Sequence, residues 1–206
     1  NEYINKKYVS MLIVSEVMSE LTNKSKELNC DIKELSSTLL FVGVKNSRYL
    51  AGHIGDGVIG TVENNEVKVL SHPDNGEFAN ITYFITGNYA IDKLRTYSRL
   101  CNGVEGFVLM TDGASESIYH KKDKSLAKIC VKLINYLKDN SEEQCCKFLE
   151  SLLKNEIVKR TIDDCSIALM SLDDVEGSSE FSKFKMEYYY IKKSLSLNIV
   201  LKEITK

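Results

Sequence analysis

The sequence lacks most of the features that would tie it to nucleic acid, a membrane or a secretory route. Its formal net charge is only -2, and its 27 Lys and Arg residues are scattered, so it has no basic field that would attract polyanions. No apolar run approaches the roughly 18 residues needed to span a bilayer, and no charged segment followed by an apolar one opens the chain. We therefore expect a cytoplasmic protein with no nucleic-acid or membrane partner.

Paired cysteine motifs are also missing. The six cysteines include no CxxC pair and have no matching His spacing, which argues against both a zinc site and a disulfide framework. Reduced, mostly buried thiols are the expectation. The length of 206 residues suits one sizeable core or two small ones. Taking the first, we place a single domain over 1–172 and a linker with a C-terminal extension over 173–206.

The pattern of apolar residues predicts strands, then a pair of helices, then a returning strand. Apolar positions recur at steps of three and four from about 7 to 28, which indicates a helix with one buried face. Ser141 followed by two acids and Gln144 predicts a helix start. This order favours an α+β domain. The other expected helices are about 123–138 and 142–158, and the strands are 38–44, 48–55, 57–63, 64–72, 81–87, 105–111 and 165–172.

The first of three acidic turns is "HIGDGVIG", where Asp56 stands between Gly55 and Gly57. Flanking glycines let the backbone bend tightly and leave room for a ligand to approach the carboxylate. The alternative is a plain hairpin turn, which is the more frequent use of Asp-Gly between apolar strands.

The second and third acidic turns also lie next to buried strands. In "VLMTDGASES", Asp112 and Glu116 are four residues apart, so they repel one another in a helical turn unless a cation or proton lies between them. In "TIDDCSIALM", Asp163 and Asp164 precede an apolar strand, and only one of them can face the same site. The alternatives are a helix cap at Asp112 and solvated acids elsewhere.

Together these turns predict a site for hard divalent ions. A sheet-based core can bring Asp56, Asp112 and Asp163 to one rim, and clustered carboxylates suit Mg²⁺ or Mn²⁺, whereas zinc favours His or Cys. Metals held in this way turn water into a nucleophile and neutralise phosphate oxygens. The pattern therefore indicates phosphoester hydrolysis without a covalent enzyme intermediate.

Five segments carry a resemblance to a known family. The chain contains, in this order, "SSTLLFVGV", "HIGDGVIG", "NGEFANITYF", "VLMTDGASE" and "DDCSIALM". From about Ser36 to Leu172 it thereby resembles the metal-dependent serine/threonine protein phosphatases (PPM, or type 2C), and most closely a bacterial branch. The resemblance implies two packed antiparallel sheets flanked by helix pairs, with metals in a cleft at one end, and a phosphoprotein as substrate.

The resemblance also implies roles for individual residues. Asp112 matches a ligand of the second metal, and Asp163 matches the acid that completes the shell of that metal. Asp56 and Glu116 match the acids that hold a weaker third ion, so two or three Mg²⁺ or Mn²⁺ ions are expected. The backbone of Gly57, which replaces the usual serine, and that of Gly113 are expected beside these ions.

One part of the family pattern is absent from this sequence. The Asp-Gly-x-Gly segment, whose Asp bridges both metals, should precede the first long helix, and the sequence begins at that helix with Asn1. Three explanations are open: an N-terminal segment is missing, a partner chain supplies it, or the domain is a non-catalytic relative that serves interaction or sensing. A start without Met favours the first, in which case this chain alone lacks part of the first metal site.

Overall fold

The computed structural model describes residues 6–74, 82–172 and 184–191, which form two compact units. The first unit consists of Asn1–Val44, Arg48–Asp56 and Pro73–Leu100, and the second of Lys45–Ser47, Gly57–His72 and Cys101–Lys206. Helices and antiparallel sheets occur in both, so the α+β class predicted from the sequence is confirmed. No helix in the described ranges is long and apolar enough to cross a bilayer.

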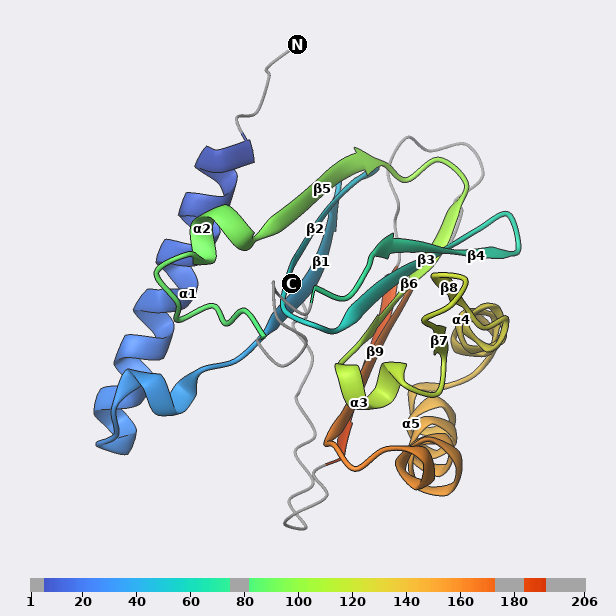
Figure 1. The fold of residues 1–206 in the computed structure, drawn as a ribbon. Helices are drawn as coiled ribbons and strands as arrows, with labels where there is room; N and C mark the ends of the chain where they lie inside the picture. The colour runs from blue at the N-terminus through green and yellow to red at the C-terminus, as the bar shows by residue number, and fades with distance from the viewer. Residues whose placement is uncertain (1–5, 75–81, 173–183, 192–206) are drawn as a thin grey trace. The chain divides into compact units, whose positions relative to one another are not determined.

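The first unit is a three-stranded antiparallel sheet with a long helix (Figure 1). The strand order is β1-β2-β5, and β1 and β2 are joined by Asn46 and Ser47, both with positive φ, which is the turn that suits the twist of a two-residue hairpin. The apolar face of α1 packs on a core that includes Val14, Ile54 and Ile85. The elements are α1 (Lys6–Leu28), a short helix (Ile32–Leu35), β1 (Leu39–Lys45), β2 (Arg48–Ile54), α2 (Ala90–Lys93) and β5 (Arg95–Leu100).

The second unit is built on a five-stranded antiparallel sheet in the order β10-β9-β6-β3-β4. Helices α4 and α5 lie beside this sheet (Figure 1), and α4 contacts β9, β6 and β3. The elements are β3 (Val58–Glu63), β4 (Glu66–Ser71), β6 (Val104–Met110), α3 (Asp112–Ser115), β7 (Tyr119–His120), β8 (Ser125–Leu126), α4 (Ile129–Asp139), α5 (Glu142–Leu152), two further helical turns (Leu153–Ile157 and Val158–Arg160), β9 (Cys165–Leu172) and β10 (Phe184–Ile191).

The helix pair of the second unit closes its core. Leu133 and Ile134 of α4 and Leu149 of α5 are buried against strand residues such as Val108 and Ile167. Ser141 caps α5 as predicted, because its hydroxyl accepts from the Gln144 backbone while the Gln144 side chain accepts from the Ser141 backbone.

Two sequence predictions of local structure are wrong, and one strand was missed. Thr82–Gly87 is irregular, although an apolar strand was expected over 81–87. Residues 123–128 contain β8 and turns, so α4 begins at Ile129 rather than near 123. The strand β5 was not predicted, because Arg95–Leu100 is rich in polar residues and only partly buried. The linker with its C-terminal extension, expected over 173–206, lies outside the described residues except for 184–191.

The C-terminal segment contributes a strand to the sheet. Strand β10 pairs with β9 along its whole length, from Phe184 opposite Leu172 to Ile191 opposite Cys165. The five-stranded sheet therefore includes residues from the region that the sequence suggests as an extension after 172.

All six cysteines are free thiols. Cys30 and Cys146 are partly exposed, and the other four are buried in the second unit. Burial raises the pKa of Cys130 to about 12 and raises that of Cys101, so these two thiols stay protonated and unreactive near neutral pH.

Candidate functional site

Three chain segments reach the same end of the five-stranded sheet. In the antiparallel register, Met110 at the end of β6 lies opposite Ile167 near the start of β9 and opposite Val58 at the start of β3. The residues just beyond these strand ends are Gly57, Asp112 and Asp163–Asp164. The sheet therefore brings the second and third acidic turns to the same end of its strands, together with Gly57.

Thr111 ties the two acidic strand ends together. Its backbone N–H donates to the Ser166 carbonyl at 3.1 Å, and its hydroxyl accepts from the Ser166 N–H at 2.9 Å. The same hydroxyl lies 3.5 Å from the Asp164 carbonyl. The backbones that carry Asp112 and Asp163 are thus held side by side, and sequence reasoning did not single out Thr111 because its partners are 53 and 55 residues away.

Gly113 allows this close approach. A Cβ atom at this position would lie 2.6 Å from the Asp164 carbonyl oxygen and 3.1 Å from Asp163 Cβ. A side chain would therefore have to push the two acidic segments apart. The glycine of "TDG" is required by the contact between two turns and not by an unusual φ angle.

Asp112 begins a helical turn at this end of the sheet. Thr111 occupies the cap position of α3, so the alternative in which Asp112 itself is the N-cap is wrong. The Asp112 carbonyl accepts from the Glu116 N–H at 3.0 Å and from the Ser115 hydroxyl at 3.0 Å. Glu116 is exposed one turn after Asp112, whose side chain is partly buried.

Asp163 projects from a turn that local hydrogen bonds define. Its N–H donates to the Thr161 hydroxyl at 3.1 Å, and its carbonyl accepts from the Cys165 thiol at 3.6 Å. Thr161 and Cys165 are buried, whereas Asp163 is exposed. The backbone of Asp163 is therefore anchored while its carboxylate remains accessible from solvent.

Asp56 belongs to the first unit, where it follows β2. Because β2 pairs with β1 and β5, and β3 pairs with β4 and β6, Asp56 does not lie in a hairpin turn, and that alternative is wrong. Gly55 has φ of +117°, and a Cβ there would lie 2.3 Å from Thr38 Cγ2, so only glycine suits this bend. The Thr82 hydroxyl donates to Asp56 Oδ2 at 2.6 Å.

The carboxylates at this end of the sheet are ligands of the kind that a hard cation prefers. They are too few to fill its coordination shell by themselves. Asp112 and Asp163 offer carboxylate oxygens, which Mg²⁺ and Mn²⁺ prefer, and these ions keep several waters in their shell. Within the described residues, no group of three His, Cys, Asp or Glu side chains is placed to hold a metal ion.

His53, three residues before Asp56 in the chain, is a buried residue with a structural role. It is fully buried in β2, and its Nδ1 lies 3.0 Å from Arg95 Nη2. Since a guanidinium can only donate, the imidazole accepts and is neutral, with its proton on Nε2. Burial and the adjacent Arg95 charge lower the pKa of His53 to about 3.

The fold resembles that of solved bacterial phosphatases. A bacterial serine phosphatase gives a TM-score of 0.51 at 13% identity over 79% of this chain and 68% of its own. A variant of a bacterial serine phosphatase gives a TM-score of 0.50 at 11% identity, over 68% of this chain and 60% of its own. PppA, a key regulatory component of T6SS in Pseudomonas aeruginosa, gives a TM-score of 0.48 at 14% identity, over 76% of this chain and 64% of its own. This chain therefore spans about three fifths to two thirds of their lengths.

A family model described as protein phosphatase 2C matches residues 4–154. The chain belongs to the protein phosphatase 2C family, as the five segments in its sequence suggested. No curated protein matches it. The family is generally metal-dependent, which agrees with the carboxylates of Asp112 and Asp163 at one end of the sheet.

Proposed function

We propose that this protein is a metal-dependent phosphatase that hydrolyses phosphoserine or phosphothreonine in a protein substrate. The observation that carries the proposal is the junction of Asp112 and Asp163, whose backbones are joined through Thr111 and Gly113 at one end of the sheet. Family membership supplies the reaction class.

In this proposal, Asp112 and Asp163 hold Mg²⁺ or Mn²⁺, and Asp56 and Glu116 support a further ion. A divalent ion in such a site acidifies water and neutralises phosphate oxygens. The chain contributes the orientation of the ligands. Thr111 and the Thr161 turn fix the backbone beneath Asp163, and the Thr82 hydroxyl donates to Oδ2 of Asp56 and so restrains that carboxylate.

The test is the Mn²⁺-dependent hydrolysis of an aryl phosphate by the full-length protein. Replacing Asp112 with Asn keeps the size of the side chain but removes its charge, so we expect at least about a 100-fold loss of kcat/KM. The matched control is Asp123→Asn, which removes an exposed acid between β7 and β8 and should leave the rate unchanged. Equal activity of Asp112→Asn and wild type would rule out this assignment of the site.

A second candidate function is a non-catalytic interaction or sensing module on the same fold. The observation that favours it is that no three metal-binding side chains form a group in the described part of the chain. Calorimetric titration with Mn²⁺ separates the two. Binding that is lost in both Asp112→Asn and Asp163→Asn supports the phosphatase, whereas no binding by full-length wild-type protein supports the module.

A further inference from the structure

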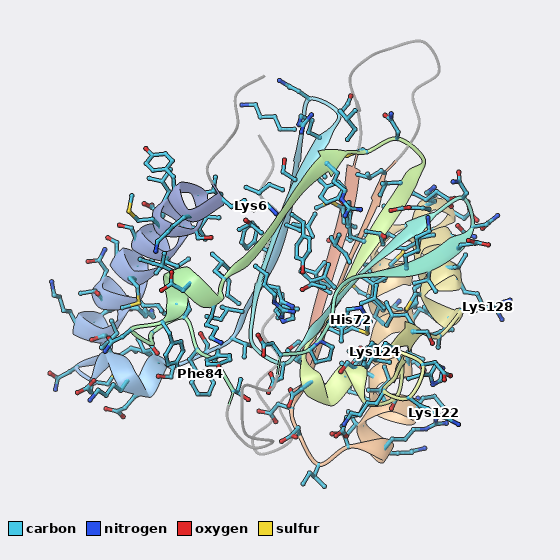
Figure 2. The ribbon with its side chains drawn as sticks, turned by 45° about the horizontal axis from the view of Figure 1, so that its top comes forward. Lys6, His72, Phe84, Lys122, Lys124 and Lys128 are labelled. Atoms are coloured by element: carbon cyan, nitrogen blue, oxygen red, sulfur yellow. The ribbon has the colours of Figure 1, made fainter. Side chains whose placement is uncertain are left out.

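A short hairpin of the second unit carries a cluster of lysines. Its strands are β7 and β8, and the segment 119–128, which we call the lysine hairpin, contains the exposed residues Lys121, Lys122, Lys124 and Lys128. In the described part of the chain these lysines form no ion pair, whereas four other lysines of the second unit each lie within 4.0 Å of a Glu carboxylate. Figure 2 shows Lys122, Lys124 and Lys128 around the hairpin and the start of α4.

The base of the lysine hairpin is fixed to α3, the turn that begins with Asp112. The Ile118 N–H donates to the carbonyl of the last α3 residue at 3.0 Å, and the Ile118 carbonyl accepts from the Ala127 N–H at 2.9 Å. Tyr119 and Leu126 are buried in the core of the second unit. Both arms of the hairpin are therefore anchored, and the lysines are presented on a fixed support.

The lysines lie within reach of a peptide whose phosphorylated residue is at Asp112. Since α3 rises about 1.5 Å per residue and the chain from Ser115 to Lys121 at most about 3.5 Å per residue, the Cα atoms of Asp112 and Lys121 are at most about 26 Å apart. An extended peptide covers this distance in about eight residues.

Two of the lysines occupy positions that the backbone disfavours. Lys124 has φ of 50°, whereas the other described non-glycine residues with positive φ are Asn or Ser. Lys128 occupies the cap position of α4, whose first turn contains no acid, and Lys132 follows one turn later. Because the start of a helix favours negative charge and neighbouring cations repel one another, a bound anion would stabilise this arrangement.

We propose that the lysine hairpin binds an acidic segment of the protein substrate, within about eight residues of the phosphoserine or phosphothreonine. This inference rests on the proposed phosphatase function and adds the class of substrate, which is a phosphoprotein with Asp and Glu near the phosphorylated residue. Several ammonium groups on one support attract such a segment and favour it over neutral sequences. Nucleic acid fits less well, because a net charge of -2 repels a long polyanion.

The first test compares phosphothreonine peptides in Mn²⁺-dependent hydrolysis by the full-length protein. One peptide has a run of Asp and Glu before the phosphothreonine, a second has the run after it, and a third has Asn and Gln in both places. We expect kcat/KM to be about tenfold higher for at least one acidic peptide than for the neutral one. This preference should decrease as the salt concentration rises.

The corresponding variant is the triple substitution Lys121→Gln, Lys122→Gln and Lys124→Gln. It should reduce the preference to about twofold or less, because it removes most of the charge of the hairpin. Replacing the same three lysines with Arg keeps the charge and should keep the preference. Since the preference is a ratio between peptides on one protein, a general loss of activity does not affect it.

The control variant carries Lys6→Gln, Lys26→Gln and Lys33→Gln. It removes the same charge from exposed positions in the first unit and should keep the preference of wild type. The proposal is overturned by equal preference in wild type and the hairpin variant, by an equal loss in the control variant, or by a wild-type protein that does not distinguish the peptides.

Peptide binding separates a failure of this proposal from a failure of the phosphatase function. Unphosphorylated acidic peptide is added to the full-length protein in EDTA, and we expect amide chemical-shift changes at Lys121, Lys122 and Lys124 that the neutral peptide does not cause. Such changes without any hydrolysis would support the acidic-peptide surface and reject the phosphatase, whereas hydrolysis without them would do the reverse. A DNA duplex that binds more tightly than the acidic peptide and shifts the same amides would also overturn the proposal.

Discussion

Buried His53 makes the stability of the protein depend on pH. Its pKa is about 3 in the folded state, lowered first by burial and then by the Arg95 charge, against a value near 6.5 in the unfolded chain. Between these two values the unfolded state binds the proton and the folded state does not. The stabilising effect is therefore complete above about pH 6.5 and is lost as the pH falls toward 3.

This dependence is measurable by urea denaturation, followed by far-UV circular dichroism because the chain contains no tryptophan. Between pH 6 and 4.5 the His53 term should lower the free energy of unfolding by about 2 kcal/mol. His53→Gln should show a shallower decline than wild type over this range, and His120→Gln, which changes an exposed histidine, should follow wild type. Parallel slopes for wild type and His53→Gln would contradict the assigned role.

Gly113 gives a second test at the scale of a residue. A Cβ there meets the Asp164 carbonyl at 2.6 Å, so Gly113→Ala should destabilise the protein by about 1–3 kcal/mol. The control is Gly43→Ala, because a Cβ at Gly43 would meet nothing within 4 Å. We expect the control to be neutral or slightly stabilising, since alanine restricts the unfolded chain. A tolerated Gly113→Ala would show that the two acidic turns separate at little cost.

At the scale of elements, most strong local patterns predicted what the structure contains, and residues 81–87 are an exception. The long α1, the capped α5 and the apolar strands β6 and β9 follow from periodicity, caps and burial. Residues 81–87 have the composition of a strand, yet Tyr83 and Ile85 are buried without pairing in a sheet. Strand β5 was missed because its place in the sheet comes from pairing with β2, which is a tertiary effect.

The capping box of α5 should make a measurable contribution to stability. Ser141→Ala removes the acceptor for the Gln144 N–H and should cost about 1 kcal/mol. Ser151→Ala, at an exposed position near the end of the same helix, is the control and should change stability by less than about 0.5 kcal/mol. Denaturation midpoints of the two variants, compared with wild type, test the prediction, and equal midpoints would contradict it.

At the scale of the whole molecule, the sequence predicted which acids to consider but not how they are joined. The order of the acidic turns along the chain identified Asp112 and Asp163 as candidates. Their adjacency depends on the pairing of β6 with β9 and on the Thr111 bonds, which connect residues more than 50 positions apart. The partnership of Thr82 with Asp56 likewise follows from tertiary structure, since 26 residues separate them.

The pairing of β10 with β9 predicts a cost for removing the C-terminal segment. A chain that ends at Leu172 would leave one edge of β9 without its eight-residue partner, and unpaired strand edges invite self-association. We expect a lower denaturation midpoint and concentration-dependent light scattering for this shortened chain. A monomeric shortened chain with an unchanged midpoint would mean that β10 contributes nothing to the sheet in solution.

The buried cysteines of the second unit can report on local opening of its structure. Only Cys30 and Cys146 are partly exposed, and the four buried cysteines all lie in that unit. A thiol-specific reagent should modify the first two quickly, and each of the others only as often as the surrounding structure opens. Mass spectrometry of a labelling time course would thus give opening rates at four places in the unmodified protein, and the addition of Mn²⁺ would show which of them a bound ion slows.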